Sequence, residues 1–141
     1  MKHLEVVAAV LEYEGKYLCM QRGASKFDYT AYKYEFPGGK IEPSETGPEA
    51  LMRELNEEMG ITIAITKENH LISVNHTYPD FSITLHTYLV HVDSPEFDLK
   101  EHVAFKWCRT EEMDSLDWAE ADKPIIEKLK ETSYETYRCC L

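Results

Sequence analysis

A helix with clear start and stop signals lies in the middle of the sequence and constrains the fold more than any other segment. Thr46 and Glu49 stand three residues apart, as in a capping box, and Pro48 suits the first helical turn. Gly60 supplies the flexible residue at which helices commonly end. At about 100° per residue, the apolar side chains of this segment share one face: Leu51, Leu55 and Met59. The sequence therefore predicts an amphipathic helix packed on the rest of the chain.

Three carboxylates line one edge of that apolar face. Glu54, Glu57 and Glu58 follow the helical spacing, and Glu58 falls within the arc of the apolar residues. Acids at this spacing usually form a solvated helix face, and Arg53 is placed to screen them. An unpaired carboxylate on the core-facing side, however, costs several kcal/mol or takes up a proton. A divalent cation offsets that cost, and carboxylate oxygens suit Mg²⁺.

Apolar stretches before this helix predict a hairpin and a long loop. Residues 4–13 and 16–21 are rich in β-forming residues and flank a Glu-Gly pair, which predicts a β-hairpin. Residues 23–35 show no clear period and are predicted to be loop. Residues 36–39, Phe-Pro-Gly-Gly, are predicted to form a turn.

The second half of the chain predicts more strands and a final helix. Four stretches rich in β-branched and aromatic residues are predicted strands: residues 61–66, 71–78, 81–92 and 103–109. A helix is predicted to start after Asp122, with an apolar stripe made of Ile125, Ile126, Leu129 and Tyr134. The elements together predict one α/β domain over residues 1–141.

Composition excludes several classes of partner. The 26 Asp and Glu residues outnumber the 15 Lys and Arg residues, so the net charge is -11. Proteins that bind nucleic-acid polymers cluster Lys and Arg, which this chain does not. No apolar run reaches the length of a membrane span, so we expect a cytoplasmic protein. The cysteines show no zinc-ligand spacing and no disulfide framework, and we expect buried or reduced thiols: Cys19, Cys108, Cys139 and Cys140.

Residues 39–61 carry a spaced set of fixed residues that resembles a complete Nudix box. The set comprises Gly39, Glu45, Arg53, Glu54, Leu55, Glu57, Glu58, Gly60 and Ile61. The resemblance implies a mixed sheet sandwiched between α-helices, with the box forming a loop, a helix and a loop. It implies a hydrolase that uses Mg²⁺, with Mn²⁺ able to replace it.

The same resemblance assigns roles within the box. Glu54, Glu57 and Glu58 would bind the metal together with the backbone carbonyl of Gly39. Arg53 and Glu45 would orient those carboxylates through charged hydrogen bonds. The general base would come either from the box, with Glu57 as a candidate, or from a loop acid elsewhere.

Glu101 is the loop candidate, because it stands where similar proteins carry an acid that contacts metal. A solvated loop acid is the alternative interpretation of Glu101. The predicted catalytic set is therefore Arg53, Glu54, Glu57 and Glu101.

Two stretches outside the box, residues 35–42 and 121–126, are similar to MutT-like triphosphate pyrophosphohydrolases and the related CTP pyrophosphohydrolases. The predicted substrate-binding residues are Arg22, Glu35, Gly38, Lys40, Tyr78, Phe81 and Asp122. Lys40 would meet phosphate oxygens, with a surface lysine as the alternative. Isolated aromatics such as Tyr78 and Phe81 are more often core than base-stacking residues.

Asp122 bears on the choice of base. MutT enzymes that remove oxidised guanine triphosphate carry Asn at this place, and Asn both donates and accepts hydrogen bonds. An ionised Asp only accepts, which favours an exocyclic amino group such as cytosine N4. A protonated Asp would donate to guanine O6, and an Asp before a helix also suits a plain N-cap.

The predicted reaction is hydrolysis of a nucleoside triphosphate, with a cytidine triphosphate favoured, to the monophosphate and pyrophosphate. The alternatives are an 8-oxo-dGTP diphosphatase, a hydrolase of ADP-ribose or another nucleoside diphosphate derivative, and a non-catalytic Nudix domain that binds nucleotides. The predicted partner is a small nucleotide, not a nucleic-acid polymer or a membrane. The protein is expected to be a monomer or a homodimer.

Overall fold

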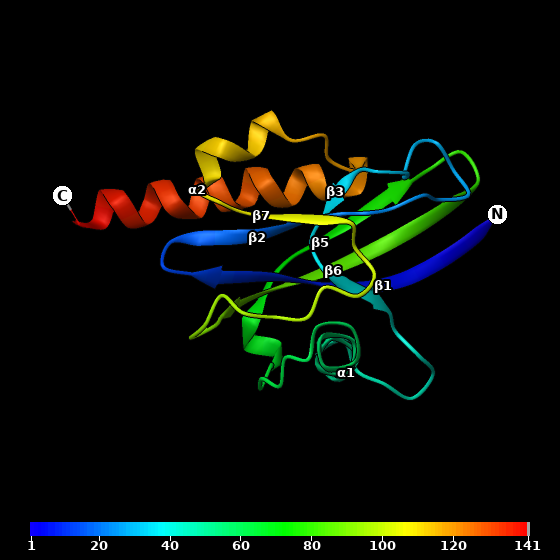
Figure 1. Cartoon of the computed structure of the whole chain (residues 1–141), viewed down its shortest axis with the longest axis horizontal. Coiled ribbons are helices and arrows are strands. Elements are labelled where there is room, and N and C mark those ends of the chain that lie inside the picture. The colour runs from blue at the N-terminus through cyan, green and yellow to red at the C-terminus, as the bar shows by residue number, and fades with distance from the viewer. Residues whose placement is uncertain (141) are drawn as a thin grey trace.

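The computed structural model describes the backbone of residues 1–140 and the side chains of residues 1–132. Within this range the chain forms a seven-stranded mixed sheet with one long helix on each face (Figure 1). The strands are β1 (Lys2–Tyr13), β2 (Lys16–Gln21), β3 (Tyr34–Glu35), β4 (Gly38–Lys40), β5 (His70–Thr77), β6 (Phe81–His91) and β7 (Ala104–Cys108). The α-helices are α1 (Gly47–Met59) and α2 (Lys123–Cys140), and three 3-10 turns cover Lys67–Asn69 (η1), Thr110–Ser115 (η2) and Glu120–Asp122 (η3). The predicted fold class is confirmed.

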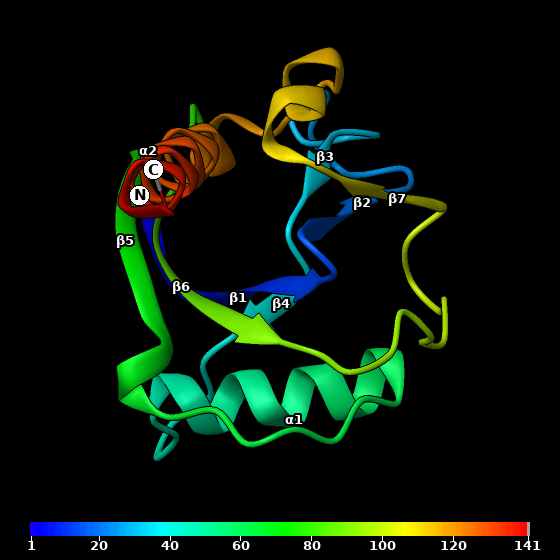
Figure 2. The ribbon, with the colours of Figure 1, turned by 90° about the vertical axis from the view of Figure 1, so that its left-hand side faces the viewer.

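Strand β1 lies at the centre of the sheet, which forks on one side of it. On the other side, β6 runs parallel to β1 along almost its whole length, and β5 pairs antiparallel with β6. On the forked side, β4 pairs with the middle of β1, whereas β2 pairs with β1 only beside the hairpin turn. Strand β2 then leaves β1 to pair with β3 and β7. Away from the hairpin turn, β1 and β2 therefore diverge within the curved sheet (Figure 2).

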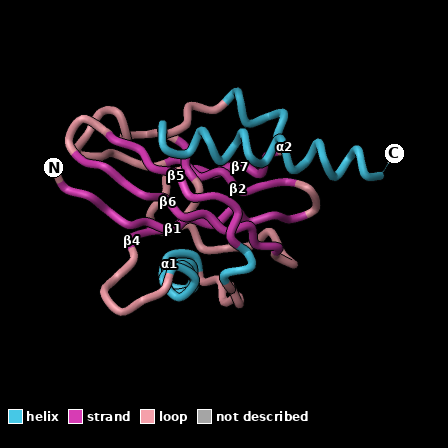
Figure 3. The backbone as a smooth tube through the Cα atoms, turned by 180° about the vertical axis from the view of Figure 1, so that it is seen from behind, coloured by secondary structure: helices cyan, strands magenta, loops and turns pink. Residues whose placement is uncertain are grey.

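The side chains on the two faces of β1 belong to two separate apolar clusters. Ala8 and Val10 pack towards α2, whereas Val7, Ala9 and Leu11 pack towards α1, as the two-residue period of a strand requires. The predicted apolar faces of the helices are buried, namely Leu51, Leu55 and Met59 on α1 and Ile125, Ile126 and Leu129 on α2. Figure 3 shows the resulting layers from behind, with α1 and α2 on opposite sides of the sheet.

The local signals for the hairpin and for α1 are confirmed. Glu14 and Gly15 both have positive φ, at 50° and 80°, which matches the twist of a tight hairpin. The Thr46 hydroxyl accepts from the amide of Glu49, the Glu49 carboxylate accepts from the amide of Thr46, and Gly60 ends the helix at φ 66°. The hairpin turn, the capping box and the helix end at Gly60 each depend only on residues close in sequence.

Three predictions about extended segments need correction. Residues 61–66 lie outside the sheet as extended chain, with Ile61, Ile63 and Ile65 directed into the apolar cluster beneath α1. The alternation therefore indicated an extended segment but not a strand partner. The predicted turn at residues 36–39 contains the start of β4, and the predicted loop at residues 23–35 ends in β3.

The predicted state of the cysteines is confirmed for Cys19 and Cys108, which are buried free thiols. Burial raises the pKa of the Cys19 thiol well above its usual range. Cys139, Cys140 and Tyr134 lie outside the residues whose side chains are described.

Candidate active site

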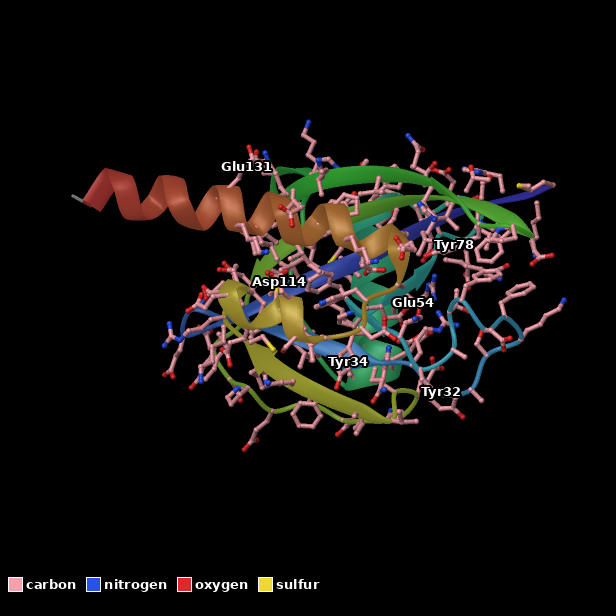
Figure 4. The ribbon with its side chains drawn as sticks, turned by 90° about the horizontal axis from the view of Figure 1, so that it is seen from above. Tyr32, Tyr34, Glu54, Tyr78, Asp114 and Glu131 are labelled. Atoms are coloured by element: carbon pink, nitrogen blue, oxygen red, sulfur yellow. The ribbon has the colours of Figure 1, made fainter. Side chains whose placement is uncertain are left out.

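A cavity of about 1430 Å³ opens where β1 and β2 diverge. It is lined by most of the residues that the sequence nominated, namely Arg22, Glu35, Gly38, Gly39, Lys40, Glu54, Glu58, Tyr78, Phe81, Glu101 and Asp122. Figure 4 labels Glu54 and Tyr78, which come from α1 and from the end of β5. Residues from distant parts of the sequence thus share one space.

Arg53 lies behind the residues that line the cavity and connects several residues of the box through hydrogen bonds. Its Nε and Nη2 donate to the two carboxylate oxygens of Glu45 at 2.7 and 2.9 Å, and its Nη1 donates to Glu54 at 2.9 Å. Nη2 also donates to the carbonyl oxygen of Lys40 at 3.1 Å. These hydrogen bonds from Arg53 lower the pKa of Glu45 to about 2. Arg53 therefore fixes Glu54 relative to Glu45 and to the end of β4.

Two glycines let β4 pass close to its neighbours. A Cβ atom on Gly38 would lie 1.9 Å from the carbonyl oxygen of Val7 in β1. A Cβ atom on Gly39 would lie 2.4 Å from the carboxyl carbon of Glu54. Neither glycine has a positive φ. Gly38 is therefore required by the close approach of β4 to β1, and Gly39 leaves room for the Glu54 carboxylate; neither is required by a turn.

The acidic side chains that face the cavity crowd one another. Burial, followed by the nearby Glu54 and Glu101, raises the pKa of Glu58 to about 9. Glu57 lies apart from them, because its side chain is 59% exposed and its carboxylate faces Arg53 Nη1 at 3.4 Å. Among the side chains of residues 1–132, no three His, Cys, Asp or Glu groups form a ready-made metal site.

The donor set nevertheless fits a divalent cation. Glu54, Glu58 and Glu101 bring only carboxylate oxygens, which are the ligands that Mg²⁺ prefers. Burial and the neighbouring carboxylates both raise the pKa of Glu58, and a bound cation would offset both effects.

The loop that carries Glu101 is attached on both sides. Before it, the amide of Asp98 donates to the carbonyl oxygen of Met59 at 2.9 Å, and Lys100 Nζ donates to the carbonyl oxygen of Glu57 at 3.2 Å. After it, His102 Nε2 lies 2.9 Å from Oε2 of Glu35. The loop therefore connects the last turn of α1 to β3.

Asp122 lies at the other end of the cavity, where only 5% of the residue is exposed. Its Oδ1 accepts a hydrogen bond from the amide of Phe36 at 3.2 Å. Burial raises the pKa of Asp122 well above its usual range, and Glu35 raises it further. The side chain thus serves the backbone between β3 and β4, which a plain cap of α2 would not do.

An aromatic wall borders this end. The Tyr78 hydroxyl accepts from the amide of Ala121 at 3.0 Å, and Tyr29 stacks on Tyr78 with ring centroids 5.3 Å apart. The Tyr29 hydroxyl donates to Asp80 at 2.7 Å, which pins the 23–33 loop onto the turn between β5 and β6. Tyr29 and His102 were missed by the sequence reasoning, and only the position of His102 beside Glu101 offered a signal.

Comparison with known proteins agrees with this geometry. Residues 6–128 match the NUDIX domain family. The chain belongs to the Nudix family. It is 39% identical over 127 residues to the CTP pyrophosphohydrolase of Escherichia coli (strain K12), a match that covers 90% of this chain and 91% of that protein. It is 35% identical over 133 residues to the 8-oxo-dGTP diphosphatase of the same organism, covering 92% of this chain and 98% of that protein.

A solved structure with a similar sequence shares the fold. The solution structure of the E. coli ORF135 protein superposes with a TM-score of 0.76 at 38% identity, covering 93% of this chain and 91% of that one. The chain is accordingly a Nudix hydrolase, an enzyme that cleaves an anhydride bond between nucleotide phosphates. In the part that the structure describes, none of the helices has the length and apolar character needed to cross a membrane.

Proposed function

We propose that this Nudix hydrolase is a Mg²⁺-dependent pyrophosphohydrolase that converts a cytidine triphosphate, CTP or dCTP, to the monophosphate and pyrophosphate. We propose that residues 1–141 form one Nudix domain that does this without a nucleic-acid partner. The observation that carries the choice of base is the pair formed by Glu35 and the buried Asp122 at one end of the cavity.

The two carboxyl groups differ in what they offer a base. Arg22 and His102 bind the two oxygens of Glu35 at 3.2 and 2.9 Å, as expected for an ionised group that accepts hydrogen bonds. Burial raises the pKa of Asp122, and one of its oxygens accepts from Phe36; the proposed role of its other oxygen is to carry a proton and donate it to the base. An acceptor beside a donor matches cytosine, whose 4-amino group donates and whose N3 accepts.

Uracil presents the reverse pattern, with an acceptor at O4 and a donor at N3. Such a mismatch leaves buried polar groups unpaired, and sites of this kind discriminate between substrates by large factors. We therefore expect CTP to be preferred over UTP.

The opposite end of the cavity suits the triphosphate. Glu54, Glu58, Glu101 and the carbonyl of Gly39, joined by Glu57 after a side-chain rotation, would hold Mg²⁺, which supplies charge neutralisation and an acidified water. Arg53 and Glu45 keep Glu54 in place. Lys40 lines the cavity with an exposed side chain and contacts phosphate oxygens as a point charge.

Glu101 serves as the general base in this proposal. It lies in the cavity wall, whereas Glu57 does not, and it is held between two anchored neighbours. Its carboxylate takes a proton of the attacking water, whose oxygen bonds to the α or the β phosphorus atom as the bond from that atom to the bridging oxygen breaks. The monophosphate and pyrophosphate are both released as charged groups, so no covalent intermediate with the protein is needed.

The relatives point to two substrates. The 39% identical relative bears the name CTP pyrophosphohydrolase, which supports cytosine. The 35% identical relative bears the name 8-oxo-dGTP diphosphatase, and a protonated Asp122 also suits guanine O6. Hydrolysis of 8-oxo-dGTP is therefore the second candidate function.

A substrate panel tests the proposal. CTP, dCTP, UTP, 8-oxo-dGTP, dGTP, ATP and ADP-ribose are incubated with Mg²⁺ or with EDTA, and pyrophosphate is separated from orthophosphate. We expect pyrophosphate from CTP and dCTP that EDTA abolishes, and little from UTP. Greater turnover of 8-oxo-dGTP or ADP-ribose would replace the proposed substrate. A folded protein that binds Mg²⁺ without turning over any compound would support a nucleotide-binding role.

The variant Asp122→Asn tests the base subsite. An amide cannot lose or gain a proton, but it donates and accepts at fixed atoms. The amide oxygen can accept from Phe36 and the amide nitrogen can donate where protonated Asp122 does, so we expect the variant to keep the preference for cytosine over uracil. Loss of that preference would show that Asp122 does not donate to the base.

A further inference from the structure

His102 is a nearly buried histidine in the cavity wall, and 10% of its side chain is exposed. Its Nε2 lies 2.9 Å from Oε2 of Glu35, so the tautomer protonated at Nε2 donates a hydrogen bond to that carboxylate. The other oxygen of Glu35 accepts from Arg22 Nη1 at 3.2 Å. The carboxylate of Glu35 is therefore held from two sides.

The two partners of Glu35 differ in rigidity. The Arg22 side chain is 44% exposed, and an exposed arginine loses much rotamer entropy when it is fixed in one geometry. His102 has only two rotatable bonds, is mostly buried, and makes the shorter contact. His102 therefore contributes more than Arg22 to the fixed orientation of Glu35.

The chain around His102 adds to this rigidity. Lys100 binds the last turn of α1 through the carbonyl oxygen of Glu57, and Glu101 lies between Lys100 and His102. The backbone just before His102 is thus attached to a helix, and its side chain is attached to β3. His102 therefore orients Glu35 from a position that is itself held in place, and not from a free loop.

We propose that His102 is a positioning residue that sets the preference of the site for cytosine by fixing the carboxylate of Glu35 through Nε2. This inference rests on the proposed function, in which Glu35 accepts a hydrogen bond from the 4-amino group of the base. Each carboxylate oxygen has two acceptor sites, so the bonds to Arg22 and His102 leave acceptor capacity for that amino group. Without His102, Glu35 turns on its remaining contact, its oxygens are no longer held towards the 4-amino group, and the preference for cytosine weakens.

The test measures binding without turnover. The probes are the α,β-methylene analogues of CTP and UTP, which resist cleavage, and their affinities are measured by calorimetry with Mg²⁺. In His102→Phe, which fills the space without a donor, we expect the ratio of cytidine to uridine affinity to fall roughly tenfold, as loss of a hydrogen bond to a charged group predicts. We expect His102→Gln, whose amide nitrogen reaches a similar place, to recover most of the ratio.

Two controls separate positioning from general damage. His91→Phe makes the same substitution at a histidine whose side chain is 65% exposed and which does not line the cavity, and the ratio should stay at the wild-type value. In a Glu35→Gln background, His102→Phe should change the ratio no further, because the partner through which it acts has been altered. Turnover of CTP by His102→Phe should show a raised KM.

Several results would overturn the inference. Equal weakening of both analogues in His102→Phe would show a merely structural role, and a full effect in the Glu35→Gln background would show another route. A wild-type protein that releases pyrophosphate without preferring cytosine would refute the proposed base preference and this inference together. A wild-type preference that survives in His102→Phe would refute this inference alone.

Discussion

Adding one methyl group to Gly38 or to Gly39 is expected to damage two different properties of the protein. On Gly38 the new Cβ meets backbone: it lies 1.9 Å from the carbonyl oxygen of Val7 and 2.7 Å from Cα of Ala8. On Gly39 it meets the end of a side chain, with the Glu54 carboxylate atoms at 2.4 to 2.7 Å. Backbone in a central strand cannot move alone, whereas a carboxylate can rotate.

The structure sets the size of each effect. In Gly38→Ala, reaching an ordinary contact of 3.4 Å from 1.9 Å requires a shift of 1.5 Å between β4 and β1. Such a shift breaks most of the short β1–β4 pairing, at about 1 kcal/mol per hydrogen bond and about 3 kcal/mol in total. For a chain of this size, that corresponds to a fall in Tm of about 10 °C.

Gly39→Ala should instead reduce catalysis. Moving the Glu54 carboxyl carbon from 2.4 to 3.4 Å displaces it by 1.0 Å and pulls it from Arg53. A misplacement of this size in a catalytic group costs on the order of a hundredfold in rate. Stability should change by less than about 1 kcal/mol, because the displaced side chain is able to reorient.

Differential scanning calorimetry and turnover of CTP, measured on both variants, decide between these outcomes. Gly23→Ala is the matched control, since its Cβ would meet only a methyl group of Val103, at 3.1 Å. A Gly38→Ala variant as stable as the control would show that the close approach of β4 to β1 does not matter. A Gly39→Ala variant with normal turnover would remove Glu54 from the site.

Three further predictions concern the box. Because the folded-state pKa of Glu45 is lowered to about 2 from 4.5, its contribution to stability is complete above pH 4.5 and is lost as the pH falls towards 2. The free energy of unfolding of Glu45→Gln, measured in urea, should therefore differ most from that of the wild type near pH 7 and least near pH 2. A difference independent of pH would contradict this prediction. Arg53→Lys keeps the charge but not the bidentate contact with Glu45. The affinity for Mn²⁺, measured by electron paramagnetic resonance, should therefore fall. An unchanged affinity would show that Arg53 does not position the metal ligands. Glu57→Gln should keep the wild-type Tm, since the side chain is largely exposed. Its kcat should fall by at least about a hundredfold. Near-normal turnover would limit the metal site to the other carboxylates.

The fold was predictable where the signals are local. The start and end of α1 follow from Thr46, Glu49 and Gly60, which act on neighbours within one helical turn. The extended character of residues 61–66 was also readable from alternation. Whether a strand partner lies beside an extended segment depends on the path of distant strands, and alternation carries no information about that path.

The candidate site was predictable in its members but not in its contacts. The resemblance nominated Glu35 and Asp122, whereas the partners that define their chemistry stand 67 and 86 residues away in sequence, at His102 and at Phe36. The raised pKa of Asp122 comes mainly from its burial, which no spacing rule expresses. The reason for Gly38 likewise depends on β4 packing against β1, and the reason for Gly39 on α1 packing against β4.

The separation of the apolar interior into two clusters has a consequence for how such an enzyme can change its substrate during evolution. The carboxylates of α1 depend on the cluster beneath α1, whereas Phe36, Tyr78 and Ala121, which surround Asp122, belong to the cluster beneath α2. The β-sheet separates the two clusters. Mutations that remodel the base end can therefore accumulate without loosening the acid-bearing helix. This independence offers a physical reason why relatives that share one hydrolytic box carry names that refer to different nucleotides.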